Sequence, residues 1–89
     1  VAVMHAPVAD GEFNRLRWQC RRGMRELDLL LLEFLDTGYR DLDAAAAQVF
    51  ARLLECPDAL LLEWLLGRQI PSDKDVADVV QRIRRSAAA

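Results

Sequence analysis

The chain has 89 residues, of which 53% are hydrophobic and 29% charged, and its formal net charge is −2. This composition predicts one small folded domain and excludes a disordered chain, while the acidic balance speaks against nucleic-acid binding, which needs a basic footprint. The longest apolar run, residues 29–32, is far shorter than the ~20 residues that cross a bilayer, so no membrane insertion is expected.

The N-terminal part is expected to lead from a tail into a first helix. Residues 1–11 predict a disordered or loosely ordered tail, and residues 12–86 predict a single helical domain. Asp10 is a suitable N-cap for a helix over residues 12–21. Gly23 is expected to end this helix, because glycine interrupts helices.

A second helix is predicted over residues 24–36, with Gly38 as its stop. At about 100° per residue, one side of this helix is apolar and the other is charged. The apolar side holds Met24, Leu27, Leu30, Leu31, Phe34 and Leu35. Leu29 and Leu32 fall on the charged side, so either another helix covers them or they form an apolar patch for a partner. The wheel leaves both interpretations open.

Three further helices are predicted, over residues 43–55, over residues 57–66, and after a capping box at residues 72–75. Asp41 or Asp43 is the expected cap of the third helix, and Gly67 is expected to close the fourth. The inner face of the fifth helix is predicted to hold Val76, Val79, Val80 and Ile83. Because no strand pattern is present, the predicted fold is all-α, a small compact bundle of five short helices.

Residues that carry chemistry are few. Cys20 and Cys56 are far apart and form no C-x-x-C pair, and the single histidine, His5, lies in the predicted tail. Neither a metal site nor a disulfide framework is expected, and two free thiols without a signal peptide predict a cytoplasmic protein. With no nucleophile–base set and no phosphate-binding loop, the chain is not expected to be an enzyme.

The segment RRGMRELD, residues 21–28, has two interpretations on local grounds. Arg22 and Glu26 are four residues apart, so they can form a surface ion pair worth about 0.5 kcal/mol or less. Gly23 either caps the first helix or lets a partner approach the backbone closely. The spacing alone does not choose between a structural role and a binding surface.

The wider sequence resembles a known family. WQCRRGMRELD followed by LLLLEFLDTGY is similar to the start of the succinate dehydrogenase assembly factor 2 family, the flavinators. Arg22, Gly23 and Glu26 match its R-G-x-x-E hallmark, and FARLLECPDALLLEWLLGRQIPSDKDV resembles its second half. The likeness covers about residues 13–85, and the chain departs from it at residues 57–59, where relatives place more acids before the proline.

The resemblance implies a five-helix assembly factor. Such a protein binds the flavoprotein subunit of succinate dehydrogenase, or of fumarate reductase, and promotes covalent attachment of FAD to a histidine of that subunit. We expect no tightly bound cofactor, any contact with FAD being made through the partner, and we expect a monomer. Carried over by position, the expected partner-binding residues are Arg22, Gly23 and Glu26, with Arg21, Met24, Arg25 and Asp28 as neighbours. Leu29, an apolar residue on the charged side of the second helix, completes the expected surface.

One alternative remains from the sequence. Short helices joined by turns also occur in small regulators, either antitoxin-like proteins or proteins associated with nucleic acid. Such a protein would act here mainly through protein–protein contacts, since the net charge of −2 disfavours DNA.

Overall fold

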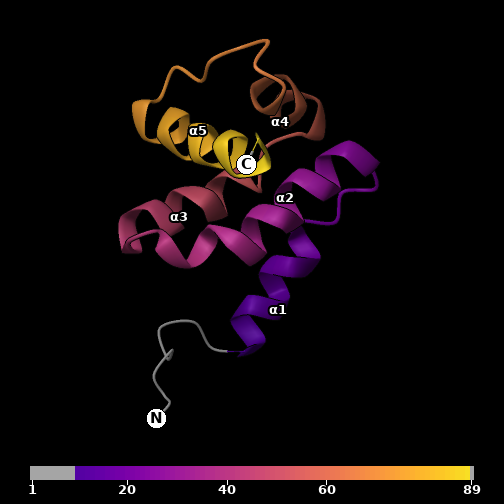
Figure 1. Cartoon of the computed structure of the whole chain (residues 1–89), viewed down its shortest axis with the longest axis vertical. Helices are drawn as coiled ribbons and strands as arrows, with labels where there is room; N and C mark the ends of the chain where they lie inside the picture. The colour runs from indigo at the N-terminus through magenta and orange to yellow at the C-terminus, as the bar shows by residue number, and fades with distance from the viewer. Residues whose placement is uncertain (1–9, 89) are drawn as a thin grey trace.

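The computed structural model describes residues 10–88, and the elements within that range are helical (Figure 1). They are the α-helices α1 (Asp10–Gln19), α2 (Arg25–Thr37), α3 (Ala44–Leu53), α4 (Asp58–Leu65) and α5 (Lys74–Ala88), and the 3-10 turn η2 (Tyr39–Asp41). The predicted all-α bundle of five short helices is confirmed over these residues. The division into a tail and a domain stays a prediction, because most of residues 1–11 lie outside the described range.

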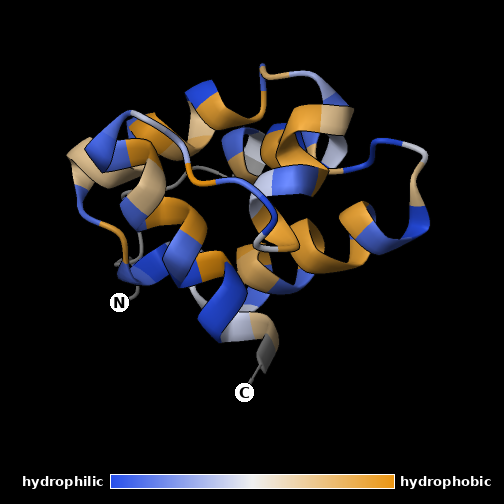
Figure 2. Ribbon diagram, turned by 90° about the horizontal axis from the view of Figure 1, so that it is seen from above, coloured by the Kyte–Doolittle hydropathy of each residue, from blue (hydrophilic) through white to orange (hydrophobic). Residues whose placement is uncertain are grey.

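Helices α2 and α5 form the centre of the packing. Helix α5 contacts α2, α3 and α4, and α2 also contacts α4. Figure 1 shows α1 at one end of the longest axis and the connection between α4 and α5 at the other. Hydrophilic residues are interleaved with hydrophobic ones along the helices (Figure 2), which lets each helix turn an apolar side inward.

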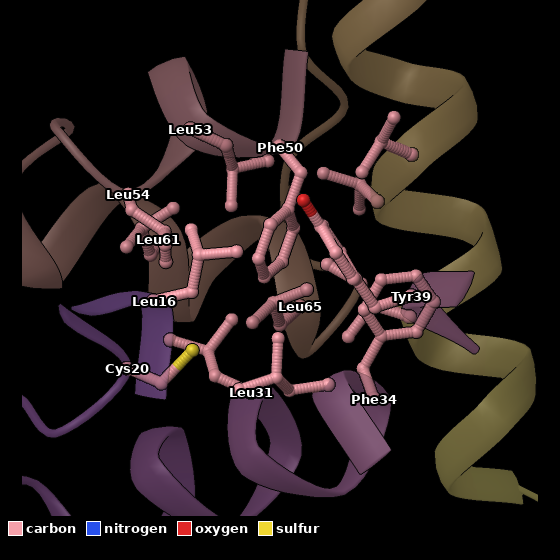
Figure 3. Packing of buried hydrophobic residues seen from close by; sticks show 14 of the residues in the cluster. Leu16, Cys20, Leu31, Phe34, Tyr39, Phe50, Leu53, Leu54, Leu61 and Leu65 are labelled. Carbon is pink, nitrogen blue, oxygen red and sulfur yellow. The ribbon is translucent and has the colours of Figure 1, made fainter. Parts of the chain in front are cut away.

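The core is built from leucines and a cluster of aromatic rings (Figure 3). The ring of Phe50 lies 5.5 Å from that of Phe34 and 5.5 Å from that of Tyr39, measured between centroids. The buried residues of α2 are Leu27, Leu31, Phe34 and Leu35, as predicted, whereas Met24 and Leu30 are half-buried against the core. Leu16 and Cys20 bring the C-terminal end of α1 into the same cluster.

Most helix ends follow the predicted signals. Asp43 caps α3 by accepting a hydrogen bond from the Ala46 N–H at 2.8 Å. Gly67, with φ +79°, follows α4 in the left-handed region, as a helix-closing glycine should. Helix α1 begins at Asp10 rather than near Glu12, so Asp10 belongs to the helix.

The predicted capping box before α5 is wrong by one residue. The carboxylate of Asp73, not the Ser72 hydroxyl, accepts from the N–H groups of Asp75 at 2.8 Å and Val76 at 3.2 Å. A carboxylate accepts two N–H donors and also complements the positive end of the helix dipole, so it is the stronger cap.

Gly38 stops α2 for a reason that the sequence does not reveal. Its φ is −124°, outside the left-handed region, but a Cβ there would lie 2.6 Å from a ring carbon of Phe34. Because Phe34 is buried and cannot swing away, we expect Gly38→Ala to lower the free energy of unfolding by about 1–3 kcal/mol. Gly11→Ala is the matched control, because a Cβ at Gly11 meets nothing within 4 Å; chemical denaturation of both variants measures the difference. Equal stability of the two variants would contradict this account.

The two free thiols differ in environment. Burial raises the pKa of the Cys20 thiol from 9.0 to about 12, against the opposing effect of the Arg22 and Arg17 charges, while Cys56 is half-buried on the α3–α4 turn. We expect iodoacetamide at pH 8 to label Cys56 and to spare Cys20 until the chain unfolds. Mass spectrometry after timed labelling measures the difference between the two thiols, and equal labelling of both would contradict the expectation. In the unfolded chain the Cys20 thiol ionises above about pH 9, whereas in the folded chain it stays neutral until about pH 12. The contribution of Cys20 to the free energy of unfolding is therefore fully present below pH 9 and is lost as the pH rises toward 12.

Candidate partner-binding surface

The motif loop, residues 20–24, joins α1 to α2 and depends on Gly23. This glycine has φ +83°, which side chains rarely adopt, and a Cβ there would meet nothing within 4 Å. The backbone conformation therefore requires glycine, while the space in front of it is open. A partner can approach the loop closely at this point.

Arg22 turns inward from the motif loop. Its side chain is only 15% exposed, and its Nε donates to the Asp58 carboxylate at 2.8 Å. Its terminal nitrogens donate to the carbonyls of Gln19 at 2.7 Å and Cys56 at 3.1 Å. The expected ion pair with Glu26 is therefore wrong: the carboxylate that Arg22 reaches belongs to the first turn of α4. Arg22 thus ties the loop to both the end of α1 and the start of α4.

Asp28 holds the motif loop from the other side. Its carboxylate accepts from the backbone N–H of Arg22 at 2.6 Å and from that of Gly23 at 3.3 Å. Charged acceptors make short, strong bonds of this kind with backbone donors. Arg22 and Asp28 together fix the path of the loop, so the loop is presented as one defined shape.

Of the remaining expected residues, Met24 is half-buried against the core and the other five lie on the outside. Arg21, Gly23, Arg25, Glu26 and Leu29 are exposed, and we call these five residues the motif surface. Leu29 is 60% exposed, whereas Leu32 is half-buried against the core. Packing against the core therefore covers Leu32. Only Leu29 is an exposed apolar side chain among charges, as the partner-patch interpretation requires. The assignment of the surface to a partner stays a prediction.

Two residues beside this surface were not predicted from the sequence. Asp58 was not expected to pair with Arg22, since the two are 36 positions apart. Trp18 is 71% exposed, and the Arg21 guanidinium lies 5.5 Å from the centre of its ring. The available signal was that Trp18 does not share the helical spacing of Phe13, Leu16 and Cys20.

Other kinds of site are not found in the described part of the chain. Within residues 10–88, no group of three or more His, Cys, Asp or Glu side chains is placed to hold a metal ion. None of the helices described is long and apolar enough to cross a membrane.

Comparison with known proteins decides the family. The family model described as Sdh5, flavinator of succinate dehydrogenase, matches residues 14–87. The chain belongs to this family. The flavinator match includes the whole motif loop and all of α2 to α4, so the resemblance seen in RRGMRELD is confirmed.

Flavinator relatives are similar over most of their length. The FAD assembly factor SdhE of Shewanella oneidensis is 45% identical over 74 residues, which cover 83% of this chain and 90% of that protein. The FAD assembly factor SdhE of Coxiella burnetii is 38% identical over 82 residues, covering 92% and 96%. The one of Pseudomonas aeruginosa is 43% identical over 72 residues, covering 81% and 86%.

Proposed function

We propose that this flavinator is an assembly factor that binds the flavoprotein subunit of succinate dehydrogenase and promotes covalent attachment of FAD to it. Its family is described as a flavinator of succinate dehydrogenase and its relatives are named FAD assembly factors, so the chain is a helper and not an enzyme. The proposal rests on the motif loop. Hydrogen bonds of Arg22 and Asp28 fix its path, while the space beside Gly23 is open to a partner. We call the flavoprotein subunit the client.

The arrangement favours a positioning mechanism. A rigid surface that binds one domain arrangement of the client raises the population of that arrangement. If the client's histidine and flavin are aligned in it, their reaction gains the advantage of proximity. Direct action by Arg22 is disfavoured, because its charge already pairs with Asp58. An exposed carboxylate such as Glu26 suits binding better than acid–base chemistry.

Within residues 10–88, the hollow beside α1 and α3 does not suit FAD. Glu12, Tyr39 and Asp43 are among its lining residues. A dinucleotide diphosphate favours a free helix N-terminus, but Asp43 already occupies that of α3 with a negative charge. We therefore propose that the client holds FAD and that this chain contacts it only through the client.

The proposal extends to client range, location and assembly. The family resemblance also implies the flavoprotein subunit of fumarate reductase, and we propose it as a second client. Both described cysteines are free thiols, which supports a reducing compartment, the cytoplasm. We propose that the protein acts as a monomer and without nucleic acid, in line with its net charge of −2.

A pull-down with the tagged chain and purified FAD-free client tests the proposal. We expect the client to co-elute with the wild-type chain and to be lost with Glu26→Ala. Asp78→Ala removes an exposed carboxylate of α5 that lies beside α3 and should retain the client. Absence of the client from the wild-type eluate, together with salt-sensitive nanomolar binding to duplex DNA, would contradict the proposal and favour a small regulator.

A further inference from the structure

Trp18 is a large apolar side chain that lies on the surface and not in the core. Among residues 10–88, the exposed large apolar side chains are Trp18, Leu29, Leu66 and Ile70. Trp18 is the largest of them, and tryptophan is usually buried over most of its area. The fold itself gains little from an indole at this position, since 71% of the residue stays in solvent.

Trp18 lies on the helix that is joined to the Leu29 side of α2. The ion pair between Arg17 and Asp36 joins α1 to α2 on the outside of the bundle, and Arg17 lines one small hollow together with Trp18. Asp36 lies seven residues after Leu29, about two helical turns, so both project from the same side of α2. Helix α1 is therefore attached to the side of α2 from which Leu29 projects.

Arg21 connects Trp18 to the motif surface. It belongs to the motif surface, and its guanidinium lies over the indole of Trp18 at 5.5 Å from the ring centre. A cation over the face of tryptophan is attracted by the ring, which limits the conformations of both side chains. An aromatic side chain that is ordered before binding loses less entropy when a partner covers it.

We propose that Trp18, held by Arg21, is an anchor of the client interface and extends it from the motif loop along α1. This inference rests on the proposed function and names a contact that the R-G-x-x-E motif does not contain. Tryptophan and arginine are the residues most often found at the energetic centre of interfaces. The matching client surface is an apolar recess for the indole, rimmed by carboxylates that accept Arg21 and Arg25.

Titration of the client against variants of the full chain tests the proposal. We expect Trp18→Ala to weaken binding ~30-fold and Trp18→Phe to restore part of it, because the ring contact is shortened but not removed. Ile70→Ala is the control: Ile70 is 84% exposed on the connection between α4 and α5, at the other end of the molecule (Figure 1). Its affinity should equal that of the wild type. Unchanged helical circular dichroism shows that each variant is folded.

Fluorine NMR supplies a second readout. With 5-fluorotryptophan in this chain alone, the resonance missing from Trp18→Phe is assigned to Trp18, and the other to Trp64 on α4. We expect unlabelled client to shift the Trp18 resonance more than that of Trp64.

The outcomes separate the two proposals. Wild-type affinity in Trp18→Ala, or an unmoved Trp18 resonance, combined with lost binding in Glu26→Ala, overturns the anchor and leaves the proposed function standing. Failure of the wild-type chain to bind the client overturns both.

Discussion

Gly23→Arg, and separately Glu26→Ala, should abolish covalent flavinylation of the client while the helical fold persists. Arginine at Gly23 projects into the open space in front of the motif loop, where we place the client, and Glu26 is exposed beside it. Neither residue belongs to the core. Flavin fluorescence of the client band after denaturing gel electrophoresis measures the effect, with each variant supplied at equal concentration.

Gly23→Ala is the control that separates bulk from backbone strain. Any side chain at φ +83° costs roughly 1–2 kcal/mol, so alanine and arginine should lower stability alike. Only arginine should remove flavinylation, because only arginine fills the approach to the loop. Full flavinylation with both Gly23→Arg and Glu26→Ala would end the role that we assign to the motif surface.

Arg22→Ala should lower the free energy of unfolding by about 2–3 kcal/mol and reduce flavinylation as well. The variant loses hydrogen bonds to Asp58, Gln19 and Cys56 together and leaves a half-buried carboxylate without its cation. The motif loop then loses its link to α4, so the surface becomes less well ordered. Urea denaturation gives the stability, and client flavin fluorescence gives the activity.

A double-mutant cycle with Asp58→Ala tests whether the ion pair is responsible. If Arg22 acts through Asp58, the double variant should be less destabilised than the sum of the two single variants. Strict additivity would show that the two residues act independently. Arg22→Lys should recover only part of the stability, because an ammonium cannot reproduce the fork that reaches three oxygens.

Local rules predicted most of the helices. The 3.6-residue spacing of leucines marked the inner side of α2, and Gly23, Asp43 and Gly67 marked helix boundaries because each acts on its immediate neighbours. The cap of α5 was missed by one residue, since a serine and an aspartate next to each other compete for the same donors. Which of the two side chains reaches the N–H groups depends on the backbone conformation, which the order of the residues does not specify.

Contacts between distant segments could not be predicted in this way. Arg22 had an acidic neighbour four residues away, yet it pairs with Asp58, which the fold brings to it. Likewise the wheel placed Leu29 and Leu32 together, and only the packing of the whole bundle separates the exposed one from the half-buried one. The motif residues were found through the family resemblance, whereas their division into inward and outward groups required the structure.

Acceleration of FAD attachment is tested by the time course of covalent flavin on purified FAD-free succinate dehydrogenase flavoprotein, incubated with FAD in the presence and absence of the wild-type chain. We expect covalent flavin to accumulate much faster with the chain present and the increase to vanish with Glu26→Ala. Identical time courses with and without the wild-type chain would show that the chain does not promote flavinylation.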